Sequence, residues 1–178
     1  MIGFELIKGN NTFSAVIKNG VSSIIVDRII RDNLNYLEVN FGGYDVKNNT
    51  YSRWYRKKLY LGDKFLVKVK EITENSPEIT QENDQEDYFD HNPSIGIELS
   101  LKGEVISAVI SKGSIHLITT IINNGTKNEI DLDFVAKDFI SNEVKPKKYW
   151  YRNTLQLGDE FSIEIKEMEK MTLPLETE

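Results

Sequence analysis

Cysteine is absent from the 178-residue sequence, and histidine occurs only twice. The lack of cysteine excludes a disulfide scaffold, a thiol nucleophile and a thiolate metal site. No run approaches the roughly 18 apolar residues that a membrane-spanning helix needs, so we expect no membrane contact. Residues 1–8 alternate between apolar and polar types and lack the basic start and long apolar run of a signal peptide. A cytoplasmic protein is therefore expected.

Sequence signatures of common enzymes are also missing. The chain contains no Gly-x-Ser-x-Gly elbow, no glycine-rich phosphate loop and no His-Glu-x-x-His pair. His91 lies beside several acids, but the segment from Asp84 to Asp90 lacks the central glycine and terminal glutamate of a calcium loop. We therefore predict that the protein is not an enzyme and has no catalytic residue, cofactor or metal site.

What the sequence does contain is a tandem duplication. The pattern Ile-Gly-x-Glu-Leu at residues 2–6 returns at residues 95–99, and Ser-Ala-Val-Ile at residues 14–17 returns unchanged at residues 107–110. Both matches have the same offset of 93 residues. Two separate matches at one offset indicate that a whole unit was doubled.

A longer match follows in the second half of each copy. The motif Trp-Tyr-Arg-x-x-Leu-x-Leu-Gly-Asp-x-Phe occupies residues 54–65 and again residues 150–161, at an offset of 96. Because the offset grows by three while both flanks still match, copy 2 carries a small insertion between Phe134 and Trp150. A loop is expected at this insertion.

Charge is distributed unevenly between the copies. Copy 1, residues 1–72, carries twelve basic and seven acidic residues, a net charge of +5. Residues 73–94 carry seven acids and no base and are predicted to form a solvated linker. Copy 2, residues 95–178, carries ten bases and fourteen acids, a net charge of −4. The two copies are therefore expected to present different surfaces to a partner.

Apolar and polar residues alternate in both copies, and this period of two predicts β-strands with one buried face. Turn signals such as Asn19-Gly20 separate the short runs, at a spacing that suggests five or six antiparallel strands per copy. We predict an all-β fold of two tandem homologous domains, each a small antiparallel β-sandwich or partly open barrel. The expected inward rows are Phe13, Ala15 and Ile17, then Leu37, Val39 and Phe41, then Phe65, Val67 and Val69, with their counterparts in copy 2.

Two segments mix basic and aromatic residues around the repeated tryptophans. This mixture suits stacking on nucleobases and neutralisation of phosphate. Strand alternation would place Trp54 and Tyr55 on opposite faces, and residue type favours Trp54 and Trp150 as buried anchors of the core. The candidate anion-binding residues are Arg53, Arg56, Lys57, Lys58, Lys147, Lys148 and Arg152.

Leu-Gly-Asp occurs at residues 61–63 and 157–159, just before an amphipathic strand in each copy. A glycine with positive φ, followed by an aspartate that accepts hydrogen bonds from nearby amides, is common turn chemistry. We therefore predict a structural turn at both places and not a ligand loop.

Acidic residues at outward positions of copy 2 form a second candidate surface. Asp131 and Asp133 are two residues apart on a predicted strand, so their side chains share one face at about 7 Å. This spacing suits acid–base chemistry, but a polar outer face explains it equally well. Together with Glu164, they are the candidate contact surface for a partner.

The order Ser-Ala, glycine, tryptophan and then Leu-x-Leu-Gly-Asp-x-Phe resembles small bacterial β-domains found near loci of polymorphic toxins and their immunity proteins. The resemblance covers each copy almost end to end and transfers no functional residue. It implies a non-catalytic protein that binds a protein partner, with immunity-like capture of a toxin as its specific form. An acidic copy 2 and linker would steer such a protein toward a basic partner. The alternative hypothesis is a nucleic-acid or anionic-glycan binding module that uses the basic aromatic segments.

Overall fold

The computed structural model describes residues 1–31, 34–79, 94–110, 112–124, 128–138 and 147–175. Strands account for 69% of it and helices for 0%, which confirms the all-β prediction. Copy 1 contributes strands β1 (Ile2–Lys8), β2 (Asn11–Ala15), β3 (Gly20–Arg31), β4 (Leu34–Asp45), β5 (Thr50–Lys58) and β6 (Lys64–Glu71). Copy 2 contributes β7 (Ile95–Leu101), β8 (Glu104–Ala108), β9 (Gly113–Asn123), β10 (Asn128–Asp138), β11 (Lys148–Thr154) and β12 (Glu160–Glu167).

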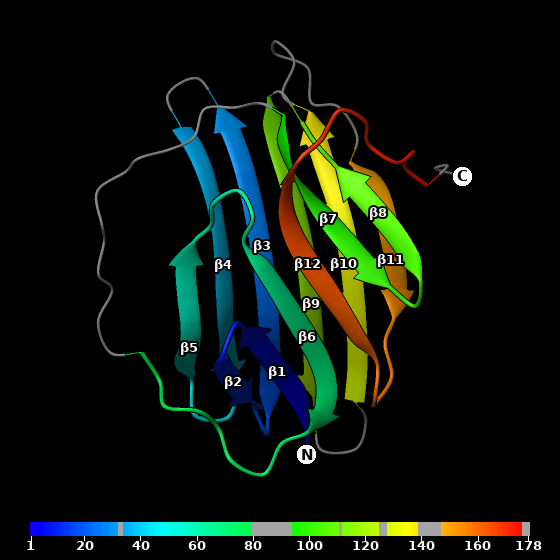
Figure 1. Cartoon of the computed structure of the whole chain (residues 1–178). Coiled ribbons are helices and arrows are strands. Elements are labelled where there is room, and N and C mark those ends of the chain that lie inside the picture. Colours follow the sequence, from blue (N-terminus) through cyan, green and yellow to red (C-terminus); the bar gives the residue numbers. More distant parts are fainter. Residues whose placement is uncertain (32–33, 80–93, 111, 125–127, 139–146, 176–178) are drawn as a thin grey trace.

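The strands form two six-stranded antiparallel sheets, and neither sheet closes into a barrel. Sheet A has the order β2-β1-β6-β12-β7-β8, and sheet B has the order β11-β10-β9-β3-β4-β5. Figure 1 shows sheet A in front, with its strands running obliquely across those of sheet B behind it. The predicted antiparallel, sandwich-like architecture is present, and each copy supplies three strands to each sheet.

The two copies join edge to edge in both sheets. In sheet A, β6 of copy 1 pairs with β12 of copy 2, and Leu66 lies opposite Ser162. In sheet B, β3 pairs with β9, and Ile25 lies opposite Ile118. Each of these pairs joins two residues that hold the same position in the repeat, so a pseudo-two-fold axis passes through both sheets. The duplicated unit thus builds a continuous sandwich by pairing with its own copy.

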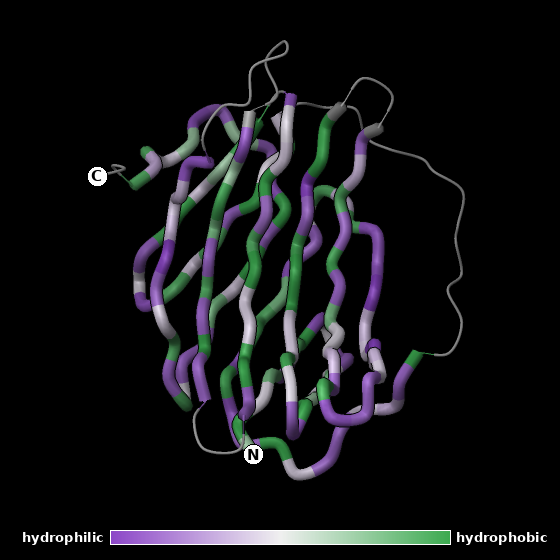
Figure 2. The backbone as a smooth tube through the Cα atoms, turned by 180° about the vertical axis from the view of Figure 1, so that it is seen from behind, coloured by the Kyte–Doolittle hydropathy of each residue, from purple (hydrophilic) through white to green (hydrophobic). Residues whose placement is uncertain are grey.

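The core lies between the sheets, and the predicted alternation accounts for it. Figure 2 views the molecule from the side of sheet B, where hydrophobic and hydrophilic positions alternate along the strands. The small residues Ala15 and Ala108 are fully buried, and Phe13 and Ile106 pack at the margin of the core. The other predicted inward positions are all buried, namely Ile17, Leu37, Val39, Phe41, Phe65, Val67, Val69, Ile110, Ile130, Leu132, Phe134, Phe161, Ile163 and Ile165.

A β-bulge in each copy turns both residues of the Trp-Tyr pair toward the core. The register of β5 against β4 shifts by one residue at Trp54, which is only 2% exposed and packs on Phe41. Tyr55 then packs on Phe13, with 4.5 Å between the ring centroids. The same shift occurs in β11 at Trp150. The prediction that the tryptophans anchor the core is confirmed, but the prediction of opposite faces is wrong, because the bulge inserts an extra residue into the strand.

The Leu-Gly-Asp segments at residues 61–63 and 157–159 are structural turns, as predicted. Their glycines have φ values of 88° and 93°. Their aspartates each accept a 2.9 Å hydrogen bond from the backbone amide three residues before them. A left-handed backbone at this place explains why glycine is retained in both copies.

These turns also bind the opposite copy. The amide of Gly62 donates to the carbonyl of Ile165 in β12 at 2.9 Å, and the amide of Gly158 donates to the carbonyl of Val69 in β6 at 2.9 Å. The two bonds are related by the pseudo-two-fold axis. The most strongly repeated motif of the sequence is therefore part of the junction between the copies.

Part of the segment predicted as a solvated linker lies against the edge of the sandwich. We name residues 72–79 strap 1 and the matching residues 168–175 strap 2. Strap 1 crosses the open side of copy 1 between β2 and β5, and strap 2 crosses the open side of copy 2 between β8 and β11. The rest of the predicted linker, residues 80–93, lies outside the described residues.

Candidate functional site

The three acids predicted as a partner surface lie on opposite faces of the sandwich. Asp131 and Asp133 lie on the outer face of sheet B, in β10, while Glu164 lies on the outer face of sheet A, in β12. Asp133 contacts Arg152 at 3.3 Å, and Glu164 contacts Lys64 at 3.6 Å. These acids therefore do not form a single surface, and two of them pair with bases of the chain itself.

The basic residues predicted as an anion-binding surface are also divided. Arg53, Arg56, Lys57 and Lys58 lie on β5, whereas Lys147, Lys148 and Arg152 lie on or beside β11. These strands are the two opposite edges of sheet B, so the groups are roughly 24 Å apart by strand spacing.

The aromatic residues of that predicted anion-binding surface belong to the core or pack at its margin. Trp54 and Trp150 are 2% and 7% exposed, and Tyr55 and Tyr151 pack against the core from its margin. Burial raises the pKa of Tyr55 to about 12, and the negative charge of Asp63 adds to this shift. Neither tryptophan offers an open ring face on which a base could stack.

A polar cluster crosses the junction of the copies on sheet B. Asp27 of β3 and Nδ1 of His116 in β9 are joined by a 2.6 Å hydrogen bond. Next to Asp27 on β4, the carboxylate of Glu38 accepts a 2.9 Å bond from Nε of Arg56. The hydrogen bond to Glu38 raises the pKa of the Arg56 guanidinium.

This cluster links strands and does not form a metal centre. Burial, with help from Glu38, raises the pKa of Tyr36 to about 12. Within the described residues, no three histidine or carboxylate side chains gather in a way that could hold a metal ion. Asp27 and Glu38 lie directly opposite each other on β3 and β4, and their bonds to His116 and Arg56 give each carboxylate a partner beside its like-charged neighbour.

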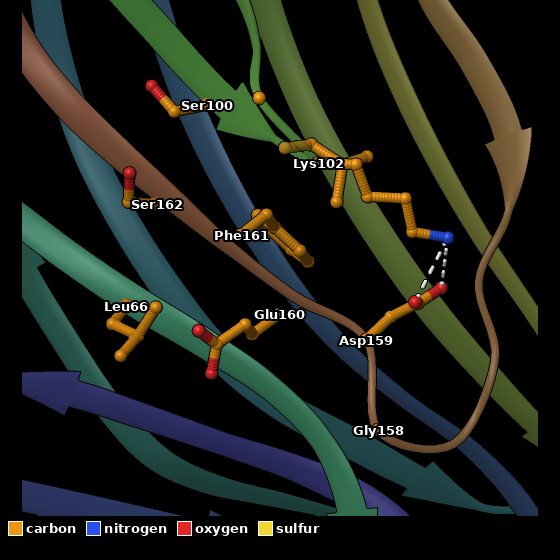
Figure 3. Close-up of a pocket in the computed structure, with 10 residues that line it drawn as sticks. Leu66, Ser100, Lys102, Gly158, Asp159, Glu160, Phe161 and Ser162 are labelled. Carbon is orange, nitrogen blue, oxygen red and sulfur yellow. Dashed lines mark hydrogen bonds and ion pairs between the residues drawn. The ribbon is translucent and has the colours of Figure 1, made fainter.

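A shallow depression of about 410 Å³ lies on the outer face of sheet A, next to the turn at residues 157–159. Figure 3 shows Lys102 reaching across to Asp159, and the two side chains form an ion pair at 3.0 Å. Desolvation opposes ionisation of Asp159, but its bonds to the Gln156 amide and to Lys102 outweigh it and lower the pKa of the carboxyl. The charged groups here neutralise each other, and the depression is explained by the turn.

A groove of about 520 Å³ lies at the edge of copy 2, between β8 and β11, and we name it the copy-2 groove. Strap 2 crosses it. Leu173 of this strap is 90% exposed, and Val105 of β8 is 54% exposed. Met171 and Leu175 are half exposed beside them. The apolar and aromatic lining consists of Val105, Ile106, Trp150, Tyr151, Leu173 and Leu175.

Charged side chains rim the copy-2 groove. The guanidinium of Arg152 stacks over the ring of Tyr149, 4.6 Å from its centroid, and contacts Asp133 at 3.3 Å. Glu104 lies on the β8 side. An apolar floor with a polar rim is the usual composition of a protein-binding surface.

The two most exposed apolar residues of the groove belong to copy 2 and not to the repeat. Thr12 of copy 1 stands where copy 2 has Val105, and Pro77 stands where copy 2 has Leu173. The copy-1 equivalent of Ile106 is Phe13, which is covered by Tyr55. The sequence prediction missed the copy-2 groove, although these changes to larger or more apolar residues in copy 2 were a signal for it.

No protein-family model, curated protein or solved structure matches this sequence. The resemblance to toxin-associated domains therefore rests on the motif residues alone. None of the described segments is a helix long and apolar enough to cross a membrane.

Proposed function

We propose that this protein is a non-catalytic binding protein and that it holds a protein partner at the copy-2 groove. The observation that carries the proposal is the group of exposed apolar side chains around that groove, above all Val105 of β8, with Leu173 of strap 2 beside it. Contiguous exposed apolar surface with a polar rim is costly in water and is a mark of protein interfaces. Burying such side chains against a partner would stabilise a complex by about 1.5–3 kcal/mol each.

The net charge of the protein favours a basic partner. Copy 2 has a net charge of −4 and the whole chain −6. Complementary charge raises the rate at which partners meet and disfavours wrong ones. Immunity-like binding of a bacterial toxin is the specific form that we propose, in line with the motif resemblance.

The burial of the tryptophans supports protein binding over nucleic-acid or glycan binding. A single-strand binder needs open aromatic faces beside a continuous basic track. Here Trp54 and Trp150 are buried, and the basic groups lie at opposite edges of sheet B.

Capture from the native cells, followed by titration with the purified partner, tests the proposal. The variant Val105→Asp should bind the partner about tenfold more weakly than the wild type, since the lost apolar contact costs more than 1.4 kcal/mol. The matched control is Val46→Asp, at a 64% exposed position in copy 1, which should bind like the wild type. Equal binding by Val105→Asp and the wild type, or loss of binding in the control alone, would refute the proposed surface.

A further inference from the structure

The two straps share the same first anchor. In copy 1, the amide of Ser76 donates to the carbonyl of Ser14 at 2.7 Å, and the amide of Ser14 donates to the Ser76 hydroxyl at 2.8 Å. In copy 2, the amide of Thr172 donates to the carbonyl of Ser107 at 3.0 Å, and the amide of Ser107 donates to the Thr172 hydroxyl at 3.1 Å. In both copies, the backbone amide and carbonyl of one serine therefore bind a strap residue that carries a hydroxyl group.

A second anchor follows three residues later. The amide of Ile79 donates to the carbonyl of Arg53 on β5 at 2.8 Å, and the amide of Leu175 donates to the carbonyl of Tyr149 on β11 at 2.6 Å. Between the anchors, the two straps differ: strap 1 has Pro-Glu, and strap 2 has Leu-Pro. The open side of each copy thus accepts an extended segment with a serine or threonine followed three positions later by isoleucine or leucine, and tolerates different residues between.

Strap 2 fills its site with little apolar burial. Met171, Leu173 and Leu175 are all exposed, so the strap is held mainly by its hydrogen bonds. These include a bond from Nε1 of Trp150 to the carbonyl of Thr172 at 2.8 Å. Hydrogen bonds of this kind each contribute only about 0.5–1.5 kcal/mol net, so a segment that also buries its apolar side chains can compete for the site.

We propose that the copy-2 groove binds an extended segment of the partner with the pattern Ser/Thr-x-x-Ile/Leu, and that this segment replaces residues 172–175 of strap 2. Leu173 then leaves the groove with the strap, and the partner contacts Val105 and the other lining residues of β8 and β11. The inference rests on the proposed function, because it names the part of a protein partner that enters the same groove. The incoming segment forms the two anchors to Ser107 and Tyr149 and accepts the bond from Trp150. Such pairing of an extended segment with exposed edge strands is a general mode of peptide recognition.

The probe is a synthetic peptide with the sequence of residues 168–178, and the matched control peptide carries valine in place of Thr172. The protein is the full chain with Thr172→Val, whose own strap has lost the hydroxyl anchor. Because the chain has only two tryptophans, the indole N–H signals of Trp54 and Trp150 are resolved by NMR and assigned with Trp54→Phe. The threonine peptide should shift the Trp150 signal and bind about fivefold more tightly than the valine peptide, as one hydroxyl hydrogen bond implies.

Leu175→Pro in the full chain provides a second test that does not depend on the hydroxyl. It removes the amide that donates to Tyr149, which weakens the hold on strap 2. The threonine peptide should therefore bind this variant more tightly than it binds the wild type. No shift at millimolar peptide, equal affinity of the two peptides, or a shift of Trp54 alone would overturn the inference. A doubled mass of the variant, with strap 2 exchanged between two chains, would overturn the assignment to a partner.

The two proposals fail in different ways. If the peptides do not bind but Val105→Asp still weakens partner binding, the segment pattern is wrong and the proposed function stands. If the peptides bind as expected but the partner is insensitive to Val105→Asp, the proposed function is wrong.

Discussion

Lys68 of copy 1 and Glu160 of copy 2 form a 3.6 Å ion pair across the junction of the copies in sheet A. The pseudo-two-fold axis relates this pair to Lys64 and Glu164, which also lie 3.6 Å apart. Each lysine thus faces a glutamate that stands at the repeat position of the other lysine. Two identical copies would place like charges opposite each other here. The opposite charges of the copies therefore favour pairing of copy 1 with copy 2.

Reversal of the charges on β6 should destabilise the protein. Lys64→Glu with Lys68→Glu puts four carboxylates across the junction, and we expect a loss of about 1 kcal/mol in the free energy of unfolding at low salt. Adding Glu160→Lys and Glu164→Lys should restore most of this loss. Urea unfolding of the three proteins checks the expectation, and the difference should shrink as salt is added. A quadruple variant as unstable as the double variant would contradict it.

Stability should fall in alkali as two half-buried phenols are forced to ionise. The pKa values of Tyr36 and Tyr55 are raised from 10.0 to about 12 in the folded state. Their contribution to the free energy of unfolding is therefore fully present below pH 10 and is lost as the pH rises toward 12. Tyr55→Phe should reduce the pH dependence of the unfolding free energy in this range, whereas Tyr60→Phe, at an exposed position, should leave it unchanged. The same slope in wild type and Tyr55→Phe would show that this phenol is not responsible.

The glycine of the repeated Ile-Gly motif should not tolerate a side chain. A Cβ atom at Gly96 would lie 2.3 Å from the carbonyl oxygen of Ala108, and one at Gly3 would lie 2.5 Å from that of Ala15. Because backbone cannot move aside cheaply, Gly96→Ala should cost about 2 kcal/mol of stability. Gly9→Ala is the comparison: it has free space but a φ of +57°, so about 1 kcal/mol is expected. Thermal or urea unfolding that ranks Gly9→Ala as the more damaging change would rule out this explanation.

Removal of Lys102 should raise the pKa of the Asp159 carboxyl. The folded-state pKa of Asp159 is below its ordinary value, so this group stabilises the protein above its unfolded pKa and ceases to do so as the pH falls through its folded pKa. In Lys102→Met this stabilising contribution should be lost at a higher pH. NMR titration of the Asp159 carboxyl carbon measures the change in its pKa. Lys170→Met, which alters a lysine of strap 2, serves as the control. An unchanged titration of Asp159 in Lys102→Met would assign its low pKa to the Gln156 amide alone.

The local part of the fold could be predicted from sequence because strand alternation and turn chemistry are local. Phe65, Val67 and Val69 follow a period of two and are buried, and Gly62 has the positive φ that its turn requires. The bulge at Trp54 was missed because one inserted residue reverses the alternation, and the sequence pattern does not mark it.

The site was missed because it depends on which sheet each strand joins. Alternation correctly placed Asp133 and Glu164 on outer faces, but only the topology puts them on opposite sides of the sandwich. The copy-2 groove depends on what covers Val105 and Leu173, and a residue's cover is a long-range property. Pairing of Ser76 with Ser14, and of Thr172 with Ser107, likewise joins segments that are distant in sequence.

Hydrogen–deuterium exchange of the full chain, alone and with its captured partner, tests most directly whether a symmetric body binds through only one of its two edges. Binding at the copy-2 groove predicts slower exchange in residues 104–108 and 148–154, with no change in the matching residues 11–15 and 50–58 of copy 1. Protection of the copy-1 edge, or of the outer face of sheet A alone, would contradict it.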